Sequence, residues 1–420
     1  MGNLTNLVYL DLSYNRFTGS IPLFHKAKTL NRIDISNNNG PLSYAKTQLA
    51  VLLSLPSLQF LSFQNRRNKL SGIIPDTFLQ NCNLRILDLN SNILEGKFPK
   101  SLQGCAFLEV LDIGNNKIRN TFPCMLKKFS NLHVLVLRSN MFHWNLRCPI
   151  ANNETWSKLQ IIDLSANNFS GSLPTRYFSS WQGMMLSSNP DQVGSKPLEV
   201  QLQAVGIFYQ VRVTLTLKGQ LMEIENILEV FTAIDFSCNN FQGEIPKVLG
   251  DLNSLYLLNL SHNALTGRIP KALGKLSQLG SLDLSVNHLS GRIPDELASL
   301  TFLSVLNLSF TQLSGRIPRG NQLQMFLENS FEGNTGLCDF PLKKYSDTEA
   351  TRPSQFPSDH SEPETIDGKY ISFALGSSVC SGIVTWLLLF SPRYNELVDR
   401  LLFRIFGQHN IAGRNGNRRR

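Results

Sequence analysis

The side chains that could perform chemistry in this chain do not form a catalytic arrangement. The 420 residues contain no Gly-rich phosphate loop, no HRD or DFG triplet, no HExxH and no GxSxG, so the usual signatures of kinases, zinc proteases and serine hydrolases are missing. The seven histidines are scattered, and His262 and His288 do not share a position within the repeats described below. We expect no enzymatic activity, no metal site and no cofactor, which leaves non-covalent binding.

The residues best suited to binding alternate with leucines in short segments. Alternation puts successive side chains of a strand on opposite faces, so these residues face away from the core. Charged and hydrogen-bonding members of the series are our candidate ligand contacts: Arg85, Glu109, His133, Arg138 and Gln160. Other outward-facing members are Tyr14, Gln59, Tyr256, His262 and Phe310.

A 24-residue repeat must position these side chains. Three consecutive copies between residues 252 and 318 read LNSLYLLNLSHNALTGRIPKALG, LSQLGSLDLSVNHLSGRIPDELA and LTFLSVLNLSFTQLSGRIPRG. Each copy places an LxL strand before an asparagine that can bond unpaired backbone groups, and glycine and proline then shape the turn. The period indicates a leucine-rich-repeat solenoid, in which stacked coils bury apolar faces that no coil could bury alone.

The same frame extends upstream and predicts eleven coils. Their first strand positions are Leu10, Ile33, Leu61, Leu87, Leu111, Leu135, Ile162, Ile234, Leu258, Leu282 and Leu306. Thr311 replaces the asparagine in the last coil, and the third coil (LSFQNRRNKLSG) carries two extra residues. We expect repeats over residues 1–175 and 228–318.

An insertion separates the seventh and eighth coils. Ile162 and Ile234 lie 72 residues apart, so about 48 residues exceed one repeat; we place the insertion, called the island below, at residues 176–227. Its segment VRVTLTLKG alternates apolar and polar side chains, which predicts a half-buried strand. The island is either a tolerated surface insertion or a binding element.

The chain changes character after Pro318. We expect a cap over residues 319–345, an acidic linker over 346–369, a transmembrane helix over 370–390 and a basic tail over 391–420. The 21 residues of the span carry no charge and would extend ~31 Å as a helix. Acidic residues before it and arginines after it place the repeats outside the cell and the tail in the cytoplasm. The alternative, a buried C-terminal helix, would have no domain to bury it.

Three small residues of the span recur every four positions and so share one stripe: Ala374, Ser378 and Gly382. Such a stripe lets two helices approach closely in a membrane. The net charge of +9 does not point to nucleic acid, because the tail contributes five of the nine units, with seven arginines against Glu396 and Asp399.

The seven cysteines cannot all pair within one chain. Cys124 and Cys148 each lie thirteen residues past a strand leucine on adjacent coils, close enough for a disulfide. We expect Cys82 and Cys105 to be buried thiols, since they fall at or near a core leucine position. Asn-x-Ser/Thr glycosylation acceptors occur at Asn3, Asn153, Asn168, Asn259 and Asn307.

The repeats, the late island, the acidic linker, the single span and the short basic tail together resemble the plant leucine-rich-repeat receptor-like proteins. GCAFLEVLDIGNNKIRNTFPCMLKKFSNLHVLVLRSN, LQIIDLSANNFSGSLP and FTAIDFSCNNFQGEIP are similar to characteristic blocks of that family. The resemblance implies an α/β-type solenoid, a plant-type leucine-rich-repeat arc of about 11 coils with an island insertion, plus one transmembrane helix.

The resemblance also implies a kinase-less receptor in the plasma membrane, single-pass type I. It would bind an extracellular peptide, protein or glycan ligand and signal through a membrane-resident receptor kinase and a co-receptor kinase. Family islands end in a Tyr followed by a Lys-Gly pair, matched here by Tyr209, Lys218 and Gly219. With Tyr256, His262 and Phe310, the first two are candidate island or co-receptor contacts, although Lys218 is equally explained as a solvated charge at a strand end.

The sequence departs from the family at both ends of the solenoid. No signal peptide or N-terminal cysteine-bearing cap precedes the first repeat, which predicts an N-terminally truncated chain. Cys338 has no partner where the family has a cysteine pair. Plant defence is the favoured role; a developmental peptide receptor component and a non-functional truncated fragment are the alternatives. A soluble enzyme inhibitor of the polygalacturonase-inhibiting type is disfavoured by the span, and a shortened receptor kinase by the family-like ending.

Overall fold

The computed structural model describes residues 4–38, 42–43, 46–64, 70–148, 156–185, 197–202, 207–217, 220–224, 227–320 and 322–342. The chain divides into two units, residues 1–346 and 347–420, and all described residues belong to the first. The predicted linker, transmembrane helix and tail lie outside the described residues. Within these, we find no helix long and apolar enough to cross a bilayer.

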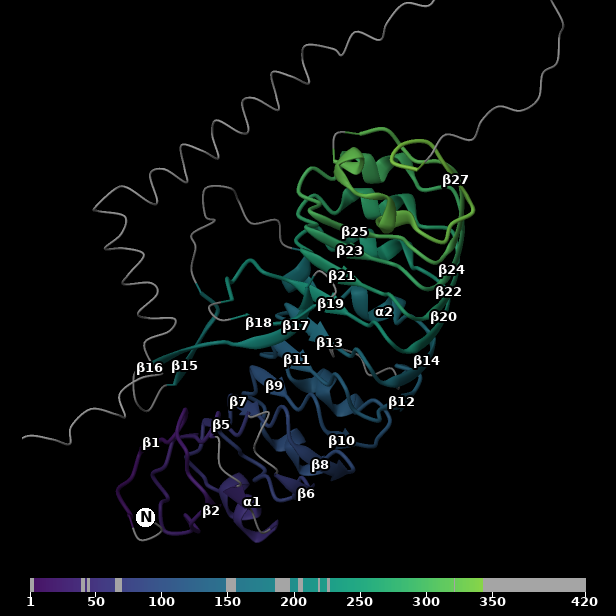
Figure 1. The fold of residues 1–420 in the computed structure, drawn as a ribbon. Helices are drawn as coiled ribbons and strands as arrows, with labels where there is room; N and C mark the ends of the chain where they lie inside the picture. The colour runs from purple at the N-terminus through teal and green to yellow at the C-terminus, as the bar shows by residue number, and fades with distance from the viewer. Residues whose placement is uncertain are drawn as a thin grey trace, which may run out of the picture. The chain divides into compact units, whose positions relative to one another are not determined.

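The repeats stack into one parallel sheet of eleven strands within the described residues (Figure 1). Its strands follow chain order, and neighbours pair at the predicted positions, for example Leu258 with Leu282. The island does not interrupt the sheet, because Ile162 pairs directly with Ile234. The strands are β1 (Tyr9–Asp11), β3 (Arg32–Asp34), β5 (Phe60–Ser62), β7 (Ile86–Asp88), β9 (Val110–Asp112), β11 (Val134–Val136), β13 (Ile161–Asp163), β19 (Ala233–Asp235), β21 (Leu257–Asn259), β23 (Ser281–Asp283) and β25 (Val305–Asn307).

A second set of parallel strands follows the turn of each coil. A three-stranded sheet contains β6 (Ser71–Ile73), β8 (Ile93–Gly96) and β10 (Lys117–Ile118). A seven-stranded sheet contains β12 (His143–Trp144), β14 (Asn168–Ser172), β20 (Asn240–Glu244), β22 (Ala264–Gly267), β24 (His288–Gly291), β26 (Gln312–Arg316) and β27 (Gly336–Cys338). The short strands β2 (Gly19–Ser20) and β4 (Leu42–Ser43) pair at the N-terminal end.

Short helices close the coils. The described residues include the α-helices α1 (Lys46–Leu53) and α2 (Thr175–Phe178). The 3₁₀ helices are η1 (Lys100–Gly104), η2 (Cys124–Lys128), η3 (Gln182–Met184), η5 (Lys247–Asp251), η6 (Lys271–Lys275), η7 (Asp295–Ser299), η8 (Leu323–Met325) and η9 (Glu328–Phe331). Several start directly after a proline, which cannot donate a backbone hydrogen bond and is therefore tolerated at a helix start.

The core runs the length of the stack between the two sets of strands. The middle residue of most strands of the eleven-stranded sheet is buried. Each repeat asparagine ties adjacent coils together: Asn263 donates to the carbonyls of Phe236, Leu260 and Ser261 at 3.0–3.1 Å and accepts from the Phe241 amide at 3.0 Å.

The cap carries an asparagine, Asn334, that bonds the last coil in the way that Asn287 bonds the coil before its own. Asn334 accepts from the Leu313 amide at 2.9 Å and from the Thr311 hydroxyl at 2.5 Å. It donates to the Leu308 and Phe331 carbonyls at 2.8 and 3.0 Å. The cap is therefore a degenerate twelfth coil, and its Asn334 also accepts the hydrogen bond from the Thr311 hydroxyl.

The described part of the island forms two antiparallel hairpins. The first pairs β15 (Glu199–Leu202) with β16 (Ile207–Gln210), and the second pairs β17 (Val213–Leu217) with β18 (Gln220–Ile224). The strand predicted in VRVTLTLKG is confirmed as β17.

Two disulfides link adjacent coils in the N-terminal half. Cys124 and Cys148 are bonded, with their Cα atoms 5.5 Å apart. Cys82 and Cys105 are also bonded, with Cα atoms 4.5 Å apart. Our expectation of buried thiols at Cys82 and Cys105 is therefore wrong: both are buried, but their coils stack so closely that the two sulfurs meet.

Candidate functional site

The face of the eleven-stranded sheet that points away from the core carries two columns of side chains. The first residue of each strand is mostly apolar from β5 to β21: Phe60, Ile86, Val110, Val134, Ile161, Ala233 and Leu257. The third residue is mostly acidic, at Asp11, Asp34, Asp88, Asp112, Asp163, Asp235 and Asp283. Because strand alternation fixes both columns, they form the surface available to anything that docks on this side.

The island occupies most of this surface. Its buried side chains Leu198, Val200, Leu202, Val211, Val213, Leu215 and Ile227 form one apolar cluster with the first column from Phe60 to Leu257. The hairpins β15–β18 run across the same side of the repeats as these strands (Figure 1). The cluster is separate from the core of the coils, so the island adds a second hydrophobic core on the outside of the sheet.

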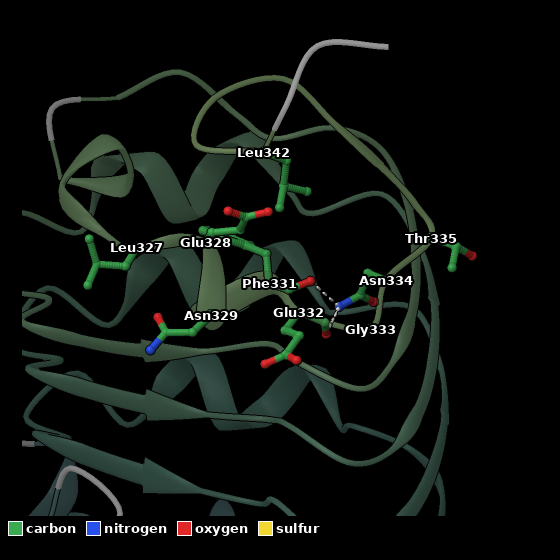
Figure 2. A pocket seen from close by; sticks show the side chains of 9 residues that line it. All are labelled: Leu327, Glu328, Asn329, Phe331, Glu332, Gly333, Asn334, Thr335 and Leu342. Carbon is green, nitrogen blue, oxygen red and sulfur yellow. Dashed lines mark hydrogen bonds between the residues drawn. The ribbon is translucent and has the colours of Figure 1, made fainter.

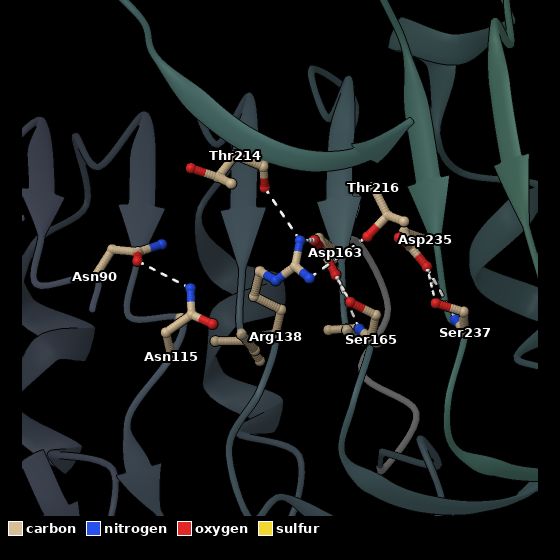
Figure 3. Close-up of polar contacts among 12 residues, drawn as sticks. Asn90, Asn115, Arg138, Asp163, Ser165, Thr214, Thr216, Asp235 and Ser237 are labelled. Carbon is tan, nitrogen blue, oxygen red and sulfur yellow. Dashed lines mark hydrogen bonds and ion pairs between the residues drawn. The ribbon is translucent and has the colours of Figure 1, made fainter. Parts of the chain in front are cut away.

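Arg138 joins the sheet to the island beneath β17. Its guanidinium donates to the Asp163 carboxylate at 3.2 Å, to the Thr214 carbonyl at 3.4 Å and to the Thr216 hydroxyl at 3.4 Å (Figure 3). The side chain of Asp163 is 0 % exposed and that of Arg138 8 %. Since removing one partner of a buried ion pair leaves an uncompensated charge, this contact depends on both residues.

The acidic column becomes an unusual row of carboxyls where it is buried. Burial, and then the neighbouring Asp112, raise the pKa of Asp88 well above its ordinary value. Burial also raises the pKa of Asp112 and of Asp235 to about 7 in each case. One oxygen of Asp235 accepts from the Ser237 hydroxyl and amide (Figure 3), whereas Oδ2 is buried with no hydrogen-bond partner among the described residues. Asp112 and Asp235 are therefore partly protonated near neutral pH.

Aromatic rings and an arginine attach the tip of the island to the first coils. The Tyr209 ring on β16 packs edge-on against Phe60, with centroids 4.6 Å apart. The Arg32 guanidinium lies 4.2 Å from the Phe60 centroid and 5.2 Å from that of Tyr209. Arg212 donates to the Tyr14 hydroxyl at 2.7 Å. The island is therefore held at its far end as well as at Arg138.

The predicted ligand contacts fall largely beneath or beside the island. Arg138 and Gln160 are buried, and the Gln160 amide donates to the Glu229 carbonyl. Arg85 and Glu109 form a half-buried ion pair, and His133 Nδ1 lies 2.9 Å from Gln160 Oε1. The prediction that Arg138 and Gln160 present free side chains to a ligand is wrong, because alternation along a strand does not reveal what later covers the strand.

The candidate island and co-receptor contacts separate into two groups. Tyr209 packs against the island's apolar cluster and is partly buried, and burial raises its pKa further above the ordinary tyrosine value; its role as an island or co-receptor contact stays a prediction. Lys218 lies outside the described residues. Tyr256, His262 and Phe310 lie beyond the island's apolar cluster and are exposed.

The uncovered end of the sheet carries exposed apolar side chains. Tyr256 is 39 % exposed and packs against Phe231, with ring centroids 5.3 Å apart. Val286 and Phe310 are 37 % and 53 % exposed at equivalent turns of successive coils. Positive φ angles of 52° and 53° at these two residues are uncommon for non-glycine side chains, so the turn holds both in a fixed direction.

A pocket of about 630 Å³ adjoins this end in the cap (Figure 2). Its lining includes Leu327, Phe331 and Leu342 together with the acidic Glu328 and Glu332. The Asn334 amide bonds the backbone at one edge of the pocket (Figure 2). No group of three or more metal-ligating side chains occurs within the described residues.

The remaining site predictions have mixed outcomes. Of the glycosylation acceptors, Asn168 is exposed, Asn307 is half-buried and Asn259 is buried at 6 % exposure; glycosylation at all three stays a prediction. Asn3 and Asn153 lie outside the described residues. The helix-pairing residues Ala374, Ser378 and Gly382 also lie outside them.

Comparison with known proteins agrees with this fold. The leucine rich repeat family model matches residues 62–118, and the single-repeat model matches residues 6–26, 158–178, 254–276 and 278–300. Receptor-like protein 35 of Arabidopsis thaliana is 39 % identical over 254 residues, covering 60 % of this chain and 25 % of its own length. Receptor-like protein 50 of the same plant is 48 % identical over 383 residues, covering 81 % and 42 %.

A solved structure is also similar. The Arabidopsis receptor kinase HAESA, in complex with the peptide hormone IDA and the co-receptor SERK1, matches with a TM-score of 0.52 and 26 % identity, covering 81 % of this chain and 56 % of that one. The chain spans between a quarter and about two fifths of the length of the two receptor-like proteins above.

The stacked coils and their matched repeats define a plant-type leucine-rich-repeat solenoid of the kind found in receptor ectodomains. The chain is a relative of the plant leucine-rich-repeat receptor-like proteins. The curated relatives are named as receptor-like proteins, not as enzymes.

Proposed function

We propose that this chain is a cell-surface receptor-like protein that binds an extracellular microbial or peptide signal and signals through partner receptor kinases in plant defence. The binding surface is the uncovered C-terminal end of the sheet, together with the outer side of the island. The observation that carries the proposal is the contrast between the island-covered strands and the exposed Tyr256, Val286 and Phe310. Exposed apolar side chains clustered on one face are typical of interaction surfaces.

The HAESA complex supports the choice of partners. That receptor binds a peptide hormone and a co-receptor, and we extend both kinds of partner to this chain as part of the proposal. The same likeness favours the alternative of a peptide receptor with a developmental role.

Membrane attachment completes the proposed receptor. Residues 370–390 would form a single type I span in the plasma membrane, with the repeats outside. The stripe of Ala374, Ser378 and Gly382 would pack against the span of a kinase partner. A tagged chain that washes off membranes in alkaline carbonate would contradict this attachment, and Gly382→Leu should reduce co-purification of kinases.

The proposal is tested with the SERK1 ectodomain as a probe, in the presence of plant apoplastic extract as the source of ligand. Tyr256→Ala with Phe310→Ala should reduce SERK1 capture by about tenfold or more, since truncating an aromatic at the centre of an interface costs more than about 1 kcal/mol. The control is Phe107→Ala, which removes an exposed aromatic (52 % exposed) from a loop far from this end. Equal capture by the double variant and the control would contradict the proposed surface.

A further inference from the structure

The seven-stranded sheet carries a row of arginines that the receptor surface does not use. Arg268, Arg292 and Arg316 occupy the same place in three successive GRIP turns, and all three are exposed. Neighbouring strands pair with an offset of two residues relative to the repeat, as Ser290 pairs with Gln312. Strands ~4.8 Å apart with this shift place equivalent Cα atoms about 8 Å apart, so the charges form an evenly spaced row.

The backbone fixes the direction of the arginine stems. Gly291 and Gly315 have φ angles of +83° and +90°, a region that favours glycine. A Cβ added at Gly291 would lie 3.1 Å from Cγ of Arg268, and one at Gly315 would lie 3.2 Å from Cγ of Arg292. The stems of Arg268 and Arg292 therefore lie across the glycine of the next coil, which reduces the conformational freedom that these two side chains would lose on binding.

Two acidic residues near this row already have other partners, whereas Glu244 holds the equivalent place one coil before Arg268 and ends the row of positive charges on that side. Within the described residues, Glu296 pairs with Lys271 at 3.0 Å and Asp339 with Arg319 at 3.5 Å. No ion pair to Arg268, Arg292 or Arg316 is found in the same part of the chain. A row of like charges is mutually repulsive, and a partner with regularly spaced anions would remove that repulsion.

Hydroxyl side chains accompany the arginines on the same face. Thr266 and Ser314 are exposed and Ser290 is half-exposed. Among the described residues, none of the three hydroxyls has a hydrogen-bond partner in the protein. The arginine face, defined as Arg268, Arg292, Arg316, Thr266, Ser290 and Ser314, thus presents both cations and neutral hydrogen-bonding groups.

We propose that the arginine face binds a linear polyuronate, a polysaccharide with one carboxylate on each sugar. The planar guanidinium matches a carboxylate with two parallel hydrogen bonds, and the hydroxyl rows match sugar hydroxyls. A polyphosphate would engage the arginines but leave the hydroxyls without sugar partners. This face belongs to the seven-stranded sheet, so its ligand is bound independently of the receptor surface on the eleven-stranded sheet.

The experiment measures binding of oligogalacturonate to the full chain in detergent micelles at low ionic strength. The triple variant Arg268→Gln, Arg292→Gln and Arg316→Gln should bind at least about tenfold more weakly, because three exposed charge pairs contribute up to ~1 kcal/mol each. The control variant Lys26→Gln, Lys28→Gln and Lys100→Gln removes three exposed charges from other coils and should bind as the parent does. Equal losses in both variants would show general charge attraction and overturn the proposal.

Two further comparisons identify the ligand class. Thr266→Ala with Ser290→Ala and Ser314→Ala should weaken oligogalacturonate binding and leave polyphosphate binding unchanged. Polyphosphate binding as tightly as oligogalacturonate, with no effect of the hydroxyl variant on either, would assign the face to phosphate polymers and overturn the proposal. Fully methyl-esterified oligogalacturonate should not bind; if it binds equally well, the arginines are not the contact.

Discussion

The coils from β5 to β21 and the coils of β23 and β25 share one backbone frame but differ in what lies on their outer face. In the first stretch the leading strand residue is apolar and buried by the island, as at Phe60, Val134 and Ile161. In the second it is Ser281 and the half-buried Val305, outside that cluster. The core of a coil determines that it stacks, whereas its outer face determines whether it packs against the island or remains available to a partner.

The same difference changes the chemistry of the acidic column. Asp112, Asp163 and Asp235 are fully buried with raised pKa values, and Arg138 is the cation among them that also contacts the island. In the uncovered stretch the two equivalents are Asp283 and the neutral Asn307. The row of carboxyls is thus coupled to island docking in one region and reduced to a single acid in the other.

The largest expected effect comes from a charge placed between island and sheet. Leu215→Asp puts a carboxylate at a fully buried position of β17, and an uncompensated buried charge costs about 4 kcal/mol. The island should detach while the coils remain stacked. Hydrogen exchange should rise in β15–β18 and in the outer-face residues of β7–β13, and protease should cut the island.

Val286→Asp is the matched control in the uncovered region, because Val286 is exposed. It should leave exchange in the island unchanged. Similar exchange in the two variants would mean that the island is not held by its apolar side chains.

The second largest effect concerns the disulfides, both of which lie in the covered region. Cys82→Ala with Cys105→Ala opens a loop of 23 residues and should lower the free energy of unfolding of the N-terminal coils by about 3 kcal/mol. Because each coil contacts only its neighbours, exchange in β23 and β25 should not change. Denaturant unfolding followed by hydrogen exchange measures both, and uniform destabilisation along the chain would contradict the regional effect.

Much of the fold could be predicted from the sequence because the same strand and turn positions recur in every coil. The first strand positions from Leu10 to Leu306 are the middle residues of the eleven strands, and β17 was predicted from alternation alone. The pairing of the strands before and after the island also follows from the sequence, because Ile162 and Ile234 hold the same position in the repeat.

The site follows less well, because alternation distinguishes inward from outward side chains but not exposed from covered ones. Arg138 points outward from the sheet and is nevertheless buried against the island. One signal was present: outward positions of a solvent-facing sheet are usually polar, yet Ile86, Val110 and Ile161 are apolar. Taken together, these apolar positions on neighbouring strands predict that another segment packs on the outer face of this part of the sheet.

The third effect is a pH dependence of island docking. Asp112 and Asp235 have pKa values of about 7 when buried, against an ordinary value near 3.8. Below pH 3.8 both are protonated whether the island is docked or released, so docking is strongest there. Between pH 3.8 and 7 both carboxyls ionise in the released state but stay protonated in the docked state, so docking should weaken steadily from pH 5 to 7 and stay level above 7. Hydrogen exchange of the β17 amides, corrected for intrinsic rates, measures this change. The backbone amides of Asp283 and Arg268, in the uncovered region, should show no matching trend in exchange.

The smallest effect assigns that pH dependence to a single carboxyl. Asp112 accepts from the Asn90 amide at 2.8 Å and from the Gly114 backbone at 2.9 Å. Asp112→Asn keeps an acceptor for the Gly114 backbone but removes one of the two titrating groups. About half of the change in docking free energy between pH 5 and 7 should disappear. Asp283→Asn removes the equivalent acid of an uncovered coil, where the neighbouring strands carry asparagine, and should leave the pH profile of the island unchanged. If both variants flatten the profile equally, the acids act through the net charge of the sheet, and the distinction between covered and uncovered coils does not extend to their electrostatics.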